Sequence, residues 1–154
     1  MPSGEPTELP KVGEQLPARS FGPFSLEDLA HYAAASGDDN PLHLDLNIAR
    51  SAGLEAPPVH GMLMMSCFEP AIAIWRPDLA ILRLSCKFLR PILAGQSIKI
   101  GGRVAQIRNN DPPVAILRLT ATGAKNELAI WAEASVLHVS HLHSFSLQAS
   151  FPGS

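Results

Sequence analysis

The hydrophobic pattern of this chain changes its period once, at Pro77, and that change sets the fold class. Before Pro77 the stretch from Gly61 to about Arg76 is apolar on nearly all sides, which predicts a buried helix that Pro70 bends or ends. After Pro77, apolar and polar residues alternate from 82 to 88, as in a half-exposed strand. A helical first half followed by a strand-rich second half indicates an α+β domain.

Three more strands are expected after the first, over residues 97–108, 114–124 and 128–139. The segment 109–113 is predicted to form a hairpin turn, and Gly101-Gly102 to form a β-bulge. One buried helix followed by long antiparallel strands is the order of elements expected for a sheet that wraps around a central helix.

The first half also carries local helix signals. Ser25 and Asp28 have the spacing of a capping box, so a helix is expected from Ser25 to near Gly37. A turn over 38–41 should follow, because Asn and Asp bond their own backbone and the residue before Pro leaves the α region. Asp45 is then expected to cap a short helix that ends at Gly53.

Length and composition indicate one domain over residues 17–140, between a flexible arm at 1–16 and a flexible tail at 141–154. The net charge is −2, which gives no reason to expect nucleic acid or an anionic membrane as partner. Cys67 and Cys86 lack the paired spacing of a zinc site or disulfide framework. Without a signal peptide or a membrane-spanning run, we expect a cytoplasmic protein.

Chemistry is concentrated in the segment Ser36 to Asp45, SGDDNPLHLD. Asp38 and His43 lie on either side of a turn, so their side chains can converge on one water molecule or one substrate carbon. Histidine suits proton transfer near neutral pH because its ordinary pKa is about 6.5. Asn40 carries both a donor and an acceptor and could hold the water.

Gly61 is the predicted third element of this site. A backbone N–H at the start of a helix has no intrahelical partner and lies at the positive end of the helix dipole. The missing side chain would let a substrate carbonyl approach closely. Gly61 is therefore a candidate oxyanion donor.

These residues resemble the signature of a known family. Tyr32-Ala33, Ser36-Gly37-Asp38, Asn40-Pro41-Leu42-His43 and Asp45 are similar to the motif of the MaoC-like (R)-specific enoyl-CoA hydratases and related dehydratases. Two shorter pieces follow in the family's order: His60-Gly61-Met62, and Lys87 to Pro91 with Ala94-Gly95. The resemblance extends from Phe24 to Val139.

The resemblance implies a hotdog fold and a homodimer, with a hydro-lyase activity that requires neither cofactor nor metal. It makes Asp38 and His43 the catalytic pair, Asn40 the residue that positions water, and the Gly61 N–H the group that receives the thioester carbonyl. Asp39 departs from the pattern, because some relatives have an aromatic or apolar residue there. That departure leaves the substrate preference open.

Simpler structural roles compete for several residues. Asp38 and Asn40 could be turn formers. His60 and Ser36 could support the loop from behind, but His60 could also be simply a buried, hydrogen-bonded histidine. Arg83, Lys87 and Arg90 could bind the phosphates of CoA, or could belong to a solvated sheet face. His138, His141 and His143 lack an acidic or cysteine partner nearby in sequence, so we expect a solvated tail and no metal site.

The main hypothesis is an (R)-specific enoyl-CoA hydratase acting on an acyl-CoA thioester. The nearest alternative is a 3-hydroxyacyl-ACP dehydratase of lipid synthesis, which runs the same chemistry backwards. A hotdog thioesterase and a non-catalytic acyl-CoA binding module are the other candidates. Acyl chain length, the carrier and the physiological direction are not encoded in any motif of the chain.

Overall fold

The computed structural model describes residues 8–143, which form a five-stranded antiparallel sheet curved over helices. The strands pair in the order β1-β3-β4-β5-β2. Their bounds are β1 Gln15–Phe21, β2 Leu79–Phe88, β3 Ile98–Arg108, β4 Val114–Thr122 and β5 Leu128–His138. The helices are α1 Leu26–Ser36, α2 Leu46–Ser51, α3 Gly61–Ser66 and α4 Phe68–Trp75, with short 3-10 turns η1 Pro41–His43, η2 Ala124–Asn126 and η3 Val139–His141.

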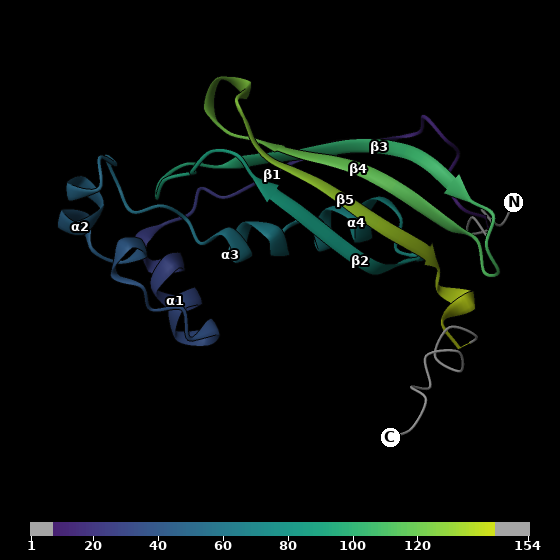
Figure 1. Ribbon diagram of the computed structural model, residues 1–154, viewed down its shortest axis with the longest axis horizontal. Coiled ribbons are helices and arrows are strands. Elements are labelled where there is room, and N and C mark those ends of the chain that lie inside the picture. The colour runs from purple at the N-terminus through teal and green to yellow at the C-terminus, as the bar shows by residue number, and fades with distance from the viewer. Residues whose placement is uncertain (1–7, 144–154) are drawn as a thin grey trace, which may run out of the picture.

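Figure 1 shows α3 and α4 under the sheet, and α1 and α2 at the end of the sheet where β2 finishes. The core lies between the inner sheet face and α4: Leu117 and Leu119 of β4 and Phe68 of α4 are fully buried. From Leu117 onward, the buried residues of β4 alternate with Arg118, Thr120 and Thr122, which are exposed or half-exposed, as the period-two pattern predicts for a sheet with one solvated face. The predicted strands after Pro77 are confirmed in number and type.

The expected single helix from Gly61 to Arg76 is two helices. The chain breaks at Cys67, three residues before Pro70. Pro70 therefore lies in the first turn of α4, where its missing N–H removes no helical hydrogen bond. Burial on all sides was also wrong, because Met62 is 59 % exposed and Ile74 is 55 % exposed.

The predicted bulge at Gly101-Gly102 is wrong for the β3–β4 ladder, whose register is continuous there and shifts between Val104 and Gln106. Gly102 has a packing role instead. A Cβ on Gly102 would collide with the Arg118 carbonyl and would lie 2.7 Å from the Leu119 Cδ2. Only glycine lets β3 and β4 approach this closely.

The first strand, β1, was not predicted. Backbone bonds before it also join residues 8–16 to the domain: Val104 donates to the Glu14 carbonyl at 2.9 Å and accepts from Gly13 at 2.9 Å. Arg76, which forms a bidentate ion pair with Asp78, donates to the Glu8 carbonyl at 2.6 Å. Contacts to the rest of the domain thus begin before the expected boundary at residue 17. Residues 1–7 lie outside the described range.

At the other end of the chain, His138 has partners that the sequence analysis did not anticipate. Its Nε2 lies 3.4 Å from the Asp78 carboxylate, and its Nδ1 lies 2.6 Å from the Ser140 hydroxyl. His138 therefore belongs to the folded end of β5 and not to a solvated tail. Most of the predicted tail, residues 144–154, falls beyond the described part. No helix within residues 8–143 is long and apolar enough to cross a membrane.

Candidate active site

The loop between α1 and α2 begins as its sequence predicts. The Ser25 capping box starts α1, and Gly37 ends it in the left-handed conformation at φ 78°. The Ser36 hydroxyl donates to the Tyr32 carbonyl at 2.7 Å and accepts from the Asp38 N–H at 3.2 Å. Ser36 thus joins the end of the helix to the backbone of Asp38.

Asn40 is the N-cap of the 3-10 turn η1. Its Oδ1 accepts from the Leu42 N–H at 3.0 Å, and its own N–H lies 3.5 Å from the Asp38 Oδ1. The turn-forming role is therefore real. It occupies the Asn40 oxygen and leaves the Nδ2 amide as the side-chain group with no partner in the described structure.

His43 is held in a defined tautomer by a residue that the sequence analysis missed, Pro58. The His43 Nδ1 lies 2.7 Å from the Pro58 carbonyl oxygen. A carbonyl only accepts hydrogen bonds, so Nδ1 carries the proton and the Nε2 of the neutral ring carries a lone pair. The half-buried His43 ring therefore presents a base at Nε2.

The position of Pro58 depends on the segment after β2. Val59 N–H donates to the Ile92 carbonyl at 2.7 Å, and Ala94 N–H donates to the Pro57 carbonyl at 2.8 Å. The second of the two shorter pieces that resemble the family, which ends in Ala94-Gly95, thus acts through its backbone. It fixes the strand-like segment whose carbonyl orients His43.

His60 lies beneath the loop and is 1 % exposed. Its Nε2 donates to the Asp38 carbonyl at 3.1 Å, and its ring stacks on His43 with centroids 4.0 Å apart. Tyr32 packs against the other side, edge to face at 4.8 Å. Burial and the neighbouring His43 lower the pKa of His60, so this ring is held neutral.

The three side chains converge, although Asp38 and His60 are 22 positions apart in sequence. Acidic or ring-nitrogen atoms of Asp38, His43 and His60 all lie within 4.8 Å of one another. This distance would also suit a metal ion. A metal ion held here would bind the Asp38 carboxylate and the free His43 nitrogen, which are the same two groups that acid–base chemistry would need. The Nδ1 of His60 is buried without a partner among the described residues.

Gly61 occupies the first position of α3, after His60 as N-cap. Its N–H has no acceptor in the described part of the chain, as expected for the first turn of a helix. The Phe88 ring would lie 3.1 Å from a Cβ at this position, so the glycine is closely covered on that side. Gly61 also borders a groove of about 280 Å³ that includes Pro58, Phe88 and Arg90.

The three predicted phosphate-binding residues do not lie together. Arg90 lines the groove beside Gly61 and forms an exposed ion pair with Glu127 at 3.4 Å. Lys87 pairs in register with Trp131, whereas its neighbour Phe88 pairs with the buried Ile130, so Lys87 lies on the outer sheet face. Arg83 shares that face. Of the three, only Arg90 is placed to meet a ligand that enters beside Gly61.

The lowered pKa of His60 predicts how stability responds to acid. The unfolded chain binds a proton at this side chain below about pH 6.5, while the folded chain resists it until a lower pH. The contribution of His60 to the free energy of unfolding is therefore fully present above about pH 6.5, and it falls as the pH drops toward the folded-state pKa. In urea titrations at several pH values, His60→Gln should weaken the dependence between pH 6.5 and 5, with His31→Gln, an exposed histidine, as control. An unchanged slope in His60→Gln would contradict the assignment.

Antiparallel strands curved over α3 and α4 define the class of this protein: it is a hotdog domain, and Asp38, His43 and Gly61 lie at one end of it. The (R)-hydratase from A. caviae aligns in structure with a TM-score of 0.74 and 31 % identity, over 82 % of this chain and 95 % of that one. In sequence, the (R)-specific enoyl-CoA hydratase of Aeromonas caviae is 34 % identical over 128 residues, which cover 82 % of this chain and 93 % of the relative.

A second relative has a different name. The mitochondrial 3-hydroxyacyl-[acyl-carrier-protein] dehydratase of Arabidopsis thaliana is 42 % identical over 90 residues, 58 % of this chain. The match spans 53 % of that relative's length. Residues 9–123 match the MaoC-like domain. The chain belongs to the MaoC-like family, whose two relatives here carry the names of hydro-lyases. The resemblance seen in the motifs is thereby confirmed.

Proposed function

We propose that this protein catalyses the reversible hydration of a trans-2-enoyl-CoA to the (R)-3-hydroxyacyl-CoA. The observation that carries the proposal is the convergence of the Asp38 carboxylate with a His43 whose Nε2 is a free base. The name and coverage of the Aeromonas relative support the direction and the stereochemistry.

In the proposed reaction, one water molecule lies between Asp38 and His43. His43 Nε2 removes a proton from the water while its oxygen bonds to Cβ, and the imidazolium then delivers that proton to Cα. One water is consumed and both catalytic groups return to their starting states. The Asp38 carboxylate accepts the second O–H of the water and stabilises the transient positive charge on His43.

Negative charge grows on the thioester oxygen during the attack, and the Gly61 N–H is the proposed donor to it. The N-terminus of α3 supplies a backbone N–H without an acceptor in the described part of the chain, and the missing side chain of Gly61 makes room for the Phe88 ring that covers it. Asn40 is proposed to hold the water through its Nδ2 amide, because its side-chain oxygen already caps η1. We propose Ser36 and His60 as positioning residues that hold the Asp38 backbone from two sides.

The second candidate is dehydration of a 3-hydroxyacyl group on acyl carrier protein, supported by the name of the Arabidopsis relative. The site chemistry is the same, since each step of the hydration is reversible. Arg90 beside the Gly61 groove suits a phosphate in either carrier, because both carry the phosphopantetheine thioester.

The deciding experiment is a comparison of matched substrates. Crotonyl-CoA and crotonyl-ACP are incubated with the protein, and the loss of the enoyl-thioester absorbance is measured with chiral analysis of the product. We expect faster turnover of the CoA substrate and an (R)-3-hydroxy product. Preference for the ACP substrate would favour the second candidate, release of free thiol would indicate a thioesterase, and binding without turnover would indicate a non-catalytic module.

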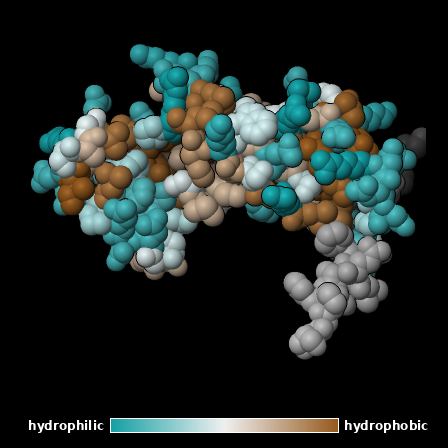
Figure 2. Space-filling view, in the orientation of Figure 1, coloured by the Kyte–Doolittle hydropathy of each residue, from teal (hydrophilic) through white to brown (hydrophobic). Residues whose placement is uncertain are grey.

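The proposed assembly is a homodimer. Strand β2 is an edge of the sheet, with backbone groups free to pair with another strand. Near its end Phe88 is 47 % exposed and Leu89 is 43 % exposed, and Met62 of the adjacent α3 is more exposed still. Figure 2 shows apolar surface interspersed among hydrophilic side chains on the single chain. Pairing of two β2 edges would cover these apolar side chains close to both catalytic loops.

A further inference from the structure

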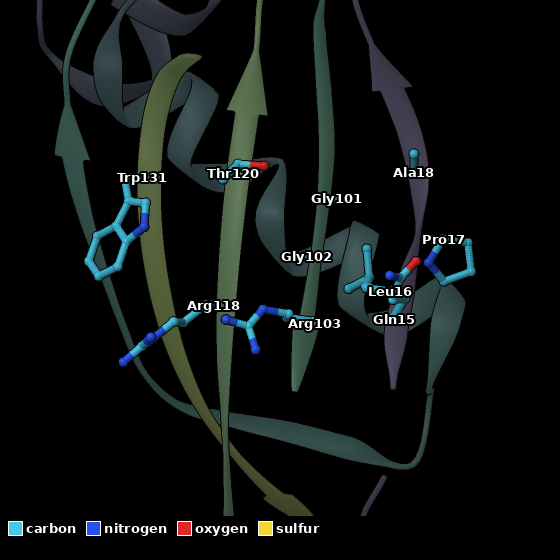
Figure 3. A pocket seen from close by; sticks show the side chains of 10 residues that line it. All are labelled: Gln15, Leu16, Pro17, Ala18, Gly101, Gly102, Arg103, Arg118, Thr120 and Trp131. Atoms are coloured by element: carbon cyan, nitrogen blue, oxygen red, sulfur yellow. The ribbon is translucent and has the colours of Figure 1, made fainter. Parts of the chain in front are cut away.

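The outer face of the sheet carries a groove that the proposed reaction does not use. Its volume is about 760 Å³, within the range of roughly 300–1,000 Å³ that small-molecule sites occupy. In Figure 3 the helices lie behind the sheet, with β1 at one end of the groove and Trp131 of β5 at the other. The groove shares no residue with the catalytic loop or with the groove beside Gly61.

Two arginines lie side by side in this groove. Arg103 of β3 and Arg118 of β4 are register partners, and both are exposed. Like charges directly opposite on adjacent strands destabilise a sheet. Within residues 8–143 neither guanidinium forms an ion pair, although the half-exposed Glu133 is the register partner of Arg118 on the other side. The two arginines therefore have one half-exposed carboxylate beside them and no ion pair among the described residues, and a bound anion would stabilise them.

The next row across the sheet is aromatic and open. Gly101, Thr120 and Trp131 are register partners, so the row has no side chain on β3, a hydroxyl on β4 and an indole on β5. Trp131 is 40 % exposed, and a Cβ added at Gly101 would meet only Ala18, at 3.9 Å. The missing side chain provides the floor of the groove, and the indole provides a flat wall on which a planar ring can stack.

The outer face of the sheet is mostly basic, in contrast to the chain as a whole. By strand register, six basic residues of the described chain lie on the outer sheet face with one acidic residue among them, whereas the whole chain has a net charge of −2. The six are Arg83, Lys87, Lys99, Arg103, Arg108 and Arg118, and the acid is Glu133. The face therefore attracts anions, and the groove is where two guanidiniums and an aromatic ring lie together.

We infer that this groove binds a nucleoside phosphate, with the phosphates on Arg103 and Arg118 and the base stacked against Trp131. Arginine forms paired hydrogen bonds to phosphate oxygens, and the row that contains Trp131 lies two residues along the strands from the arginine pair, on the same face of the sheet. The same chemistry is present in free nucleotides and in the nucleotide part of CoA. The inference does not depend on the proposed reaction.

Isothermal titration calorimetry tests the site with ADP, adenosine 3′,5′-bisphosphate and inorganic pyrophosphate, at an ionic strength of about 0.15 M. We expect Arg118→Gln and Arg103→Gln each to weaken nucleotide binding about tenfold, since a hydrogen bond to a charged group contributes that much. Trp131→Leu should weaken the nucleotides but not pyrophosphate. Arg83→Gln removes the same charge from the same face outside the groove, so affinity should stay within about twofold.

The two sources of the ligand give different orders of affinity. Tighter binding of the 3′,5′-bisphosphate than of ADP indicates the nucleotide part of CoA, and the reverse order indicates a free nucleotide. An equal loss in Arg83→Gln and Arg118→Gln would overturn the site in favour of diffuse electrostatic attraction. So would loss of binding in Arg90→Gln, which would place the nucleotide beside Gly61. Asp38→Asn should bind nucleotide normally, which separates this inference from the proposed reaction.

Discussion

Asp38→Asn is expected to lower the rate of enoyl-CoA hydration about 10³-fold, with little effect on stability. Positioned acid–base groups contribute roughly 10²–10⁴ in rate. The amide keeps the shape of Asp38 but removes the charge that holds the water and stabilises a protonated His43. The Asp38 side chain is exposed, and its backbone contacts to Ser36 and His60 do not involve the carboxylate.

The neighbouring Asp39 offers a matched control. Asp39→Asn removes the same charge from an adjacent exposed position and should leave the rate within about threefold, because a surface charge outside the reacting geometry has a small effect. Steady-state rates on crotonyl-CoA and urea unfolding curves are measured for both variants. Near-normal activity in Asp38→Asn, or equal losses in the two variants, would contradict the proposed role of Asp38.

His43 can be tested by the same logic. In His43→Asn, the Nδ2 amide can replace the Nδ1–H that donates to the Pro58 carbonyl, while the base at Nε2 is lost. A loss of about 10³-fold with a retained fold is therefore expected. Retention of more than a tenth of the activity would mean that His43 orients the loop without transferring a proton.

The second large effect is expected at Gly61, where two substitutions separate the N–H from the missing side chain. Gly61→Ala adds a Cβ and keeps the N–H. Gly61→Pro also adds a Cβ, but removes the N–H at the first helical position, where proline is favoured. The preceding residue, His60, already has ψ 129°, in the extended range that a following proline requires.

The difference between these two variants isolates the proposed oxyanion donor. Both must move the Phe88 ring, which a Cβ would approach to 3.1 Å, so this cost is shared. Removal of one such donor typically costs about 10²–10³ in rate, so Gly61→Pro should be slower than Gly61→Ala by that factor. The measurement is kcat on crotonyl-CoA for two variants with similar unfolding midpoints. Equal kcat values would exclude the Gly61 N–H as the donor.

Features that depend on neighbours within a few positions were predictable from the sequence. The Ser25 capping box, the stop at Gly37, the Asn40 turn and the Asp45 cap each close through a hydrogen bond that spans no more than four residues. The strands after Pro77 were predictable because one buried face requires a period of two. The break at Cys67 was not, because proline is tolerated in the first turn of a helix and does not itself specify where that turn begins.

Asp38, His43 and Gly61 could be proposed as site residues from the sequence, because residue type and spacing suggest their chemistry, and their roles remain predictions. Three things required the tertiary structure: the Pro58 carbonyl that sets the His43 tautomer, the burial of His60 against Asp38 and His43, and the separation of Lys87 on the outer face from Arg90 beside Gly61. Local hydrogen bonds and side-chain periods are properties of short segments. Contacts between distant segments depend on how the whole sheet closes over α3 and α4, which no short segment encodes.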